Sequence, residues 1–155
     1  MDRIDVTVTG GCQCGAVRYR ATQMLANAHL CHCRMCQKAV GNIFAALVAA
    51  PDEAVTWTRG EPAVFKSSER VERGFCAACG TPLFYHHLDS GRINFTMGSL
   101  DDPATFPPLA QVGTEARVPW FADLPSLKDF GATESVDPQG AAEIARTNRQ
   151  HPDHD

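Results

Sequence analysis

Seven cysteines in three short stretches are the residues of this 155-residue chain best suited to chemistry. The stretches are Cys12-Gln13-Cys14-Gly15, Cys31-His32-Cys33-Arg34-Met35-Cys36 and Cys76-Ala77-Ala78-Cys79-Gly80. Cysteines two or three residues apart are typical zinc ligands, because both thiolates can reach one ion. An odd number of cysteines also argues against complete pairing in disulfides. The pattern therefore predicts metal binding.

Four of the cysteines make a complete ligand set for one structural zinc ion. In an extended Cys-x-Cys segment the side chains alternate faces, so Cys12 and Cys14 should point the same way. Cys76 and Cys79 precede Gly80, which permits the tight turn of a zinc knuckle. Two pairs from distant segments supply the four thiolates of a tetrahedral site, and we expect this site to tie the two segments together.

The remaining three cysteines, Cys31, Cys33 and Cys36, predict a second zinc ion with a different role. Three protein ligands and one exchangeable position are the usual arrangement of a catalytic zinc. The alternative is a closed structural site with His29 or His32 as the fourth ligand. His32 would have to turn against the strand alternation, and His29 lies outside the cluster, so we favour the open site.

Basic residues near these cysteines are candidates for balancing thiolate charge and for holding a substrate carboxylate. Arg34 and Lys38 flank Cys36, and Arg70 and Arg73 precede the third cysteine stretch. No glycine follows Cys36 directly, so we expect the chain there to enter a helix whose free N–H groups face the metal.

Short β-type runs between turn residues predict a mainly antiparallel β fold. The runs are residues 16–22, 43–49, 54–58, 63–67, 83–87 and 93–97. A weak helical period at residues 140–146, after Pro138, predicts a short C-terminal helix. The aromatic residues expected in the core are Trp57, Phe65, Phe75, Phe84, Phe95 and Trp120. The length suits one domain, with a core from about residue 10 to about residue 130 and a tail, residues 131–155, that is helical and then loose.

Composition and charge exclude several classes of protein. Charged residues make up 21% and hydrophobic residues 44% of the chain, as in ordinary globular proteins. The formal net charge of −4, with no basic run, argues against a nucleic-acid partner. No apolar run is long enough for a membrane span, and the first residues lack the pattern of a secretory signal. We therefore expect a cytoplasmic protein, in a compartment where disulfides are rare.

The cysteine stretches resemble those of the glutathione-dependent formaldehyde-activating enzyme family, which includes the centromere protein V domain. Matching segments are residues 10–19, 31–38 and 73–83, extended by residues 98–103 and by Pro119-Trp120. The resemblance implies a β-tent fold of zinc-bridged antiparallel sheets. It also implies a structural zinc on Cys12, Cys14, Cys76 and Cys79 and a labile catalytic zinc on Cys31, Cys33 and Cys36.

The resemblance further implies a carbon–sulfur lyase that joins or separates a thiol and an aldehyde, as in S-hydroxymethylglutathione. Glutathione is the first candidate thiol, although Gln111 stands where the family often has a histidine. We expect two Zn²⁺ ions per chain, the second below full occupancy. The alternative function is a non-catalytic module with two structural zinc sites that binds a protein partner. A redox role like that of type B methionine sulfoxide reductases would need a cysteine outside the zinc ligands, and none is left over.

Overall fold

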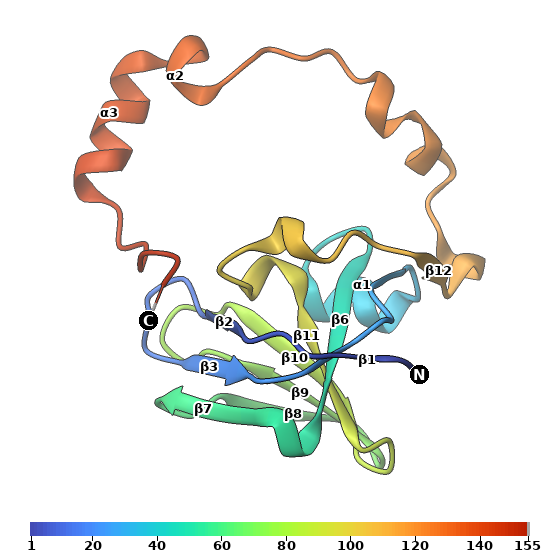
Figure 1. The fold of residues 1–155 in the computed structure, drawn as a ribbon. Helices are drawn as coiled ribbons and strands as arrows, with labels where there is room; N and C mark the ends of the chain where they lie inside the picture. The colour runs from blue at the N-terminus through green and yellow to red at the C-terminus, as the bar shows by residue number, and fades with distance from the viewer. Residues whose placement is uncertain (155) are drawn as a thin grey trace.

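The computed structural model describes residues 1–154 and is built mainly of β-strands in three sheets (Figure 1). A seven-stranded sheet has the order β12-β5-β6-β11-β10-β9-β8, a three-stranded sheet the order β2-β3-β7, and β1 pairs with β4. The strands are β1 Arg3–Ile4, β2 Val8–Gly11, β3 Arg18–Ala21, β4 Met24–Leu25, β5 His29–Cys31, β6 Ala45–Pro51, β7 Val55–Arg59, β8 Ala63–Ser68, β9 Val71–Phe75, β10 Pro82–His87, β11 Arg92–Thr96 and β12 Ala110–Val112. The predicted fold class, mainly antiparallel β, is confirmed.

All six β-type runs found in the sequence form strands, namely β3, β6, β7, β8, β10 and β11. The hairpin between β10 and β11 turns at Gly91, whose φ of +64° lies in the region that glycine adopts without strain. Strand β9 was not predicted, because Glu72, Arg73 and Gly74 interrupt its apolar pattern. It forms between β8 and β10, where the two neighbouring strands pair with its backbone N–H and C=O groups.

The main core lies where the three-stranded sheet packs on the seven-stranded sheet. Tyr19 of β3 and Phe95 of β11 are fully buried, and their rings stack with centroids 4.0 Å apart. Trp57 of β7 packs edge-on against Tyr19 at 5.7 Å. Arg18, which is 3% exposed, reaches across and pairs with Asp101 at 2.6 Å. This contact joins the small sheet to the loop after β11.

The expectation of an aromatic core was wrong for three side chains. Phe65 is 63% exposed, Trp120 is 50% exposed and Phe75 is 36% exposed. Phe65 lies on β8, the edge strand of the large sheet, so one side of its strand has no neighbour. Trp120 lies in a 3₁₀ segment, Pro119–Ser126, beyond the sheets. Phe84 and Phe95 are buried as expected, and Trp57 is partly buried.

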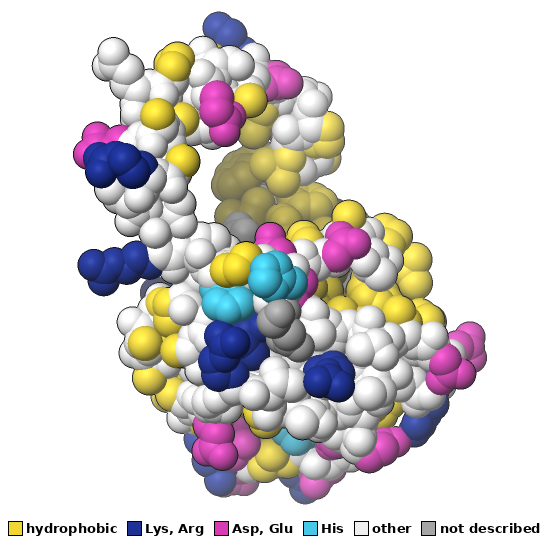
Figure 2. Space-filling model, turned by 60° about the vertical axis from the view of Figure 1, so that its left-hand side comes forward, with side chains coloured by type: hydrophobic (Ala, Val, Ile, Leu, Met, Phe, Trp, Pro, Cys, Tyr) yellow, Lys and Arg dark blue, Asp and Glu magenta, His cyan; other side chains and the backbone are white. Residues whose placement is uncertain are grey.

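The described chain also contains three short α-helices, α1 Arg34–Val40, α2 Thr133–Val136 and α3 Pro138–Thr147, besides short 3₁₀ segments. The predicted C-terminal helix is present as α3. It begins with Pro138 in its first turn, and the Asp137 side chain accepts a hydrogen bond from the Gly140 N–H at 3.0 Å. The segment carrying α2 and α3 forms an arch that stands away from the sheets (Figure 1), and hydrophobic side chains are exposed on it (Figure 2). No described helix is both long enough and apolar enough to cross a membrane.

Candidate metal centres

Four cysteine sulfurs from two distant segments meet at one end of the molecule. The Sγ atoms of Cys12, Cys14, Cys76 and Cys79 all lie within 4.8 Å of one another. Cys12 and Cys14 are 3.6 Å apart, and Cys14 and Cys76 are 3.8 Å apart. This is the set of four that the sequence predicted, and its geometry suits a single tetrahedral ion.

The backbone conformation at Cys12 and Cys14 differs from the prediction. The chain there is not extended, because it turns tightly and the Gly15 N–H donates to the Cys12 carbonyl at 3.0 Å. The second segment also turns, in a loop one residue wider, with the Gly80 N–H donating to the Cys76 carbonyl at 2.8 Å. Both glycines have positive φ, +74° and +79°. Two similar turns therefore face each other across the cluster.

The pKa values of two of the four clustered thiols are shifted in opposite directions. Burial disfavours the charged form of Cys79, but hydrogen bonds from the Thr81 hydroxyl at 3.2 Å and from the backbone outweigh it and lower its pKa to about 6. For Cys14, the backbone N–H of Ala16 favours the thiolate, yet the neighbouring cysteines and burial outweigh it and raise its pKa to about 11. Four thiolates at this spacing would repel one another, and a shared cation would offset that repulsion.

The end of the described chain contacts the turn that carries Cys12 and Cys14. The His151 N–H donates to the Gln13 carbonyl at 2.7 Å, and Arg59 lies between the Gly15 carbonyl and the His151 ring, 3.1 Å from each. A Cβ atom on Gly15 would collide with the His151 ring. The sequence suggested a loose tail after the helix and gave no sign of this contact. The histidine side chains at this end are visible beside basic side chains in Figure 2.

The second cluster is formed within one short segment. Cys31 ends β5, Cys33 caps the N-terminus of α1, and Cys36 lies in its first turn. Their Sγ atoms lie within 4.8 Å of one another, and the Cys36 N–H donates to the Cys33 Sγ at 3.4 Å. The predicted helix start is therefore present, with its free N–H groups beside the sulfurs.

Neither histidine near the second cluster belongs to it in this structure. His32 is completely buried and points away, where its Nε2 contacts the Gln111 side chain at 3.0 Å and its ring packs on Phe121 at 4.7 Å. His29 lines the neighbouring cavity, and its Nδ1 donates to the Asn27 carbonyl at 2.7 Å. Among the described residues, the cluster thus consists of three sulfurs without a fourth ligand.

One arginine balances the charge of the second cluster. Arg73 of β9 donates from Nη2 to the Cys36 Sγ at 3.5 Å and from Nε to the Ser67 hydroxyl at 3.1 Å. Burial disfavours the Cys33 thiolate, but the Cys36 backbone N–H, the neighbouring thiols and the charge of Arg73 outweigh it and lower the pKa of Cys33. Burial raises the pKa of Cys31 to about 12.

The other three basic candidates do not line the cavity beside the cluster. Arg34 donates to the Gln37 side chain at 2.6 Å, and Arg70 pairs with Asp89 at 3.2 Å on the surface. Lys38 lies in the last turn of α1 and is exposed. Of the four basic residues proposed from the sequence, the structure places only Arg73 at the site.

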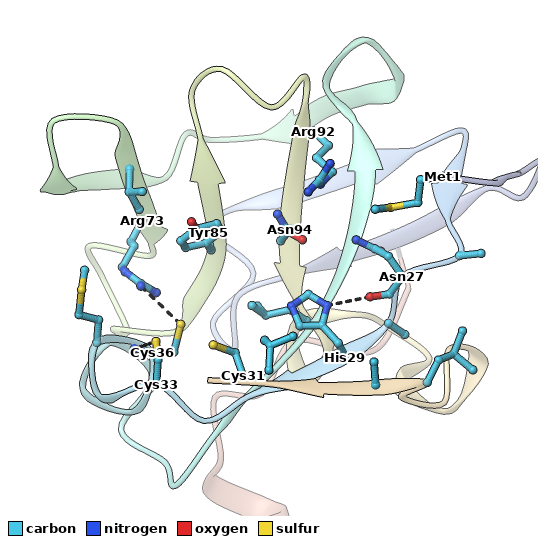
Figure 3. A pocket seen from close by; sticks show the side chains of 18 residues that line it. Met1, Asn27, His29, Cys31, Cys33, Cys36, Arg73, Tyr85, Arg92 and Asn94 are labelled. Atoms are coloured by element: carbon cyan, nitrogen blue, oxygen red, sulfur yellow. Dashed lines mark hydrogen bonds between the residues drawn. The ribbon is translucent and has the colours of Figure 1, made fainter. Parts of the chain in front are cut away.

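A cavity of about 690 Å³ opens directly beside the three sulfurs (Figure 3). This volume lies in the range of small-molecule sites, roughly 300 to 1,000 Å³. Tyr85, Asn94 and Arg92 line it from β10 and β11. Sequence reasoning missed these three residues. Their alternation along two neighbouring strands was the only signal, and it does not reveal which face meets a cavity.

A prediction concerns Gly113, which follows β12 and lies against Cys33. Its φ is +65°, and a Cβ atom there would come within 2.6 Å of the Cys33 nitrogen. Gly113→Ala should therefore displace Cys33 and weaken zinc binding at the second cluster by about tenfold. Zinc titration against a competing chelator would measure this.

Gly131→Ala is the matched control for this substitution. Gly131 also has a positive φ, +84°, but nothing lies within 4 Å of its Cβ position. It carries similar backbone strain without the contact to a ligand. Equal zinc affinities in the two variants would show that the contact with Cys33 is unimportant.

Comparisons with known proteins agree with the two clusters. The family model described as "Glutathione-dependent formaldehyde-activating enzyme" matches residues 7–116, which include all seven cysteines. A crystal structure of a Rhodobacter sphaeroides protein is similar in fold, with a TM-score of 0.56 and 20% sequence identity over 67% of this chain and 99% of that one. No curated protein matches the chain significantly.

Proposed function

Because the chain belongs to the glutathione-dependent formaldehyde-activating enzyme family, we propose that it is a zinc-dependent carbon–sulfur lyase acting on a thiol or a thiol–aldehyde adduct. The observation that carries the proposal is the set of three sulfurs, Cys31, Cys33 and Cys36, which face a cavity of about 690 Å³ and have no fourth ligand among residues 1–154. A closed structural site needs no such cavity, whereas a catalytic zinc needs an accessible position.

The donor atoms fit zinc at both clusters. Thiolate sulfur is the ligand type that zinc and other soft metals favour, and the carboxylates that magnesium or calcium would require belong to neither cluster. Cys12, Cys14, Cys76 and Cys79 would hold the structural ion, and the three remaining cysteines the catalytic one. Zinc at the second cluster would supply Lewis acidity, which lowers the pKa of a substrate thiol and polarises an aldehyde oxygen.

His29 is the residue best placed to move a proton in this reaction. Its Nδ1–H is held by the Asn27 carbonyl, so Nε2 of the neutral ring is an acceptor, and it is turned toward the cavity (Figure 3). When an adduct is cleaved, its hydroxyl proton passes to Nε2, the carbonyl forms, and the carbon–sulfur bond breaks with the electron pair left on sulfur. The proton then returns to the thiolate, and addition follows the same steps in reverse.

Arg73 keeps the second cluster compatible with an incoming thiolate. Its guanidinium lies against the Cys36 sulfur and over the Tyr85 ring, 5.1 Å from the ring centroid. Three cysteine thiolates around a divalent cation leave one net negative charge, and the positive charge of Arg73 offsets it. A second anion can therefore approach the cluster without strong repulsion.

Cobalt substitution tests whether a thiol reaches the second cluster. Cobalt bound to cysteine sulfur has a visible spectrum that depends on its ligands, and a small thiol should change it by displacing water from the open position. We expect 2-mercaptoethanol to shift the spectrum and ethylene glycol, which lacks sulfur, to leave it unchanged. Cys36→Ser, which removes one of the three ligands, should abolish the response.

Glutathione should bind no more tightly than its sulfur alone explains. A spectrum unmoved by any thiol, in protein that holds cobalt at Cys31, Cys33 and Cys36, would contradict the lyase proposal. That result would favour the alternative, a module with two structural zinc sites that binds a protein partner.

A further inference from the structure

The cavity beside the second cluster carries more positive charge than the cluster requires. Two arginines line it, Arg73 and Arg92, and no aspartate or glutamate is among its lining residues. Arg73 is already engaged with the Cys36 sulfur and the Ser67 hydroxyl. The charge of Arg92 therefore remains without a balancing group inside the cavity.

The Arg92 guanidinium has no hydrogen-bond or ion-pair partner within residues 1–154. Its Nε is inaccessible to solvent and makes no hydrogen bond, and its guanidinium forms no ion pair within residues 1–154. A buried donor without an acceptor is costly in a folded protein, so native structures rarely retain one. Of the Arg92 donors only Nε is enclosed in this way, so a ligand in the cavity would meet the two Nη groups.

The residues between Arg92 and the cysteine cluster form a row across three strands. Arg73 of β9 is opposite Tyr85 of β10, which is opposite Asn94 of β11. Arg92 lies two residues before Asn94 and so on the same face of β11. Asn94 is 6% exposed, and its side chain makes no hydrogen bond to another described residue. Figure 3 shows these four side chains on one wall of the cavity.

The register sets the length of ligand that could join the two ends. Two strand spacings and two residue steps place the backbones of Arg73 and Arg92 about 12 Å apart. Arg73 contacts the Cys36 sulfur, so a ligand with its sulfur at the cluster would need a chain of several atoms to place a carboxylate at Arg92. Leu47, Val71 and Leu109 supply apolar wall for such a chain.

We propose that Arg92 is a carboxylate anchor and that the enzyme prefers short thiols, or their aldehyde adducts, with a carboxylate at the end opposite to sulfur. The two Nη groups of an arginine can donate to the two oxygens of a carboxylate, and the Asn94 amide can donate a further hydrogen bond. This inference rests on the proposed function, because it assumes that the substrate sulfur occupies the second cluster.

Matched pairs of ligands test the anchor in protein loaded with zinc at both clusters. The acids run from 3-mercaptopropionate to 6-mercaptohexanoate, and each is compared with its primary amide by isothermal titration calorimetry. In the unmodified protein we expect the best acid to bind at least about tenfold more tightly than its amide. Arg92→Gln should abolish this preference while leaving the affinity for the amide unchanged.

Two further variants separate the anchor from general effects of charge and folding. Arg70→Gln removes the same charge from an exposed position that pairs with Asp89, and it should keep the preference for acids. Arg92→Lys retains the charge but loses the paired donors, and it should show a reduced preference. If Arg92→Gln does not fold, the preference for acids over amides can still be measured in Arg92→Lys.

Equal affinities for acids and amides in the unmodified protein would overturn the anchor and leave the lyase proposal intact. A preference for acids that survives Arg92→Gln would overturn it as well. Failure of every thiol, acid or amide, to bind protein with a loaded second cluster would instead contradict the proposed function, and the inference that rests on it.

Discussion

Cys76→Ser should unfold or aggregate the protein, whereas Cys36→Ser should leave it folded. Cys76 is 1% exposed and belongs to the main hydrophobic core, and its cluster joins two distant segments of the chain. A structural zinc site contributes roughly 10 kcal/mol or more to folding, which is comparable to the whole stability of a small domain, roughly 5 to 15 kcal/mol. Loss of one ligand there removes much of the free energy of folding.

Cys36 belongs to a cluster formed within a single segment, so its loss separates no distant segments that a zinc ion would join. The Arg73 side chain that contacts its sulfur keeps a second partner, the Ser67 hydroxyl. Thermal unfolding followed by circular dichroism, together with zinc content, would compare the two variants. Cys79→Ser removes a second sulfur of the first cluster and should behave like Cys76→Ser. Cys33→Ser removes a second sulfur of the second cluster and should behave like Cys36→Ser. Equal losses of melting temperature in Cys76→Ser and Cys36→Ser would mean that the second cluster is structural too.

Mild chelation should remove one zinc ion and leave the other in a folded protein. The second cluster borders an open cavity, so a chelator can reach its sulfurs directly. Four sulfurs from two distant segments would hold the first ion, and the His151 N–H bonds to Gln13 in the turn that carries two of them. Release from that site requires the fold to open, which couples metal loss to unfolding.

Zinc analysis and circular dichroism after each addition of chelator would show whether one ion leaves before the other and whether the fold persists. Cys36→Ser should already lack the readily removed ion and so lose little zinc at low chelator concentration. Simultaneous loss of both ions with loss of the β signal would show that the two clusters do not differ in lability.

The sequence by itself determined which cysteines belong together. The spacing of Cys31, Cys33 and Cys36 lies within one short segment, so their convergence is a local property of the chain. Cys76 and Cys79 carry the same kind of local signal, and the need for four ligands was enough to join them to the pair at the N-terminal end. The six predicted strands form for a related reason, because alternation and turn residues act within a few positions.

Only the tertiary structure decided which side chains surround the second cluster. Arg70 and Arg73 are three residues apart and equally basic, yet Arg70 lies in a surface turn while Arg73 points from β9 to the Cys36 sulfur. Arg92 and Asn94 face the cavity because β11 pairs with β10 in one particular register, and a shift of one residue would turn both away. Register and packing depend on partners distant in sequence, and so does the contact of His151 with the first cluster. The two groups of cysteines were therefore readable from the chain alone, whereas the side chains that line the cavity were not.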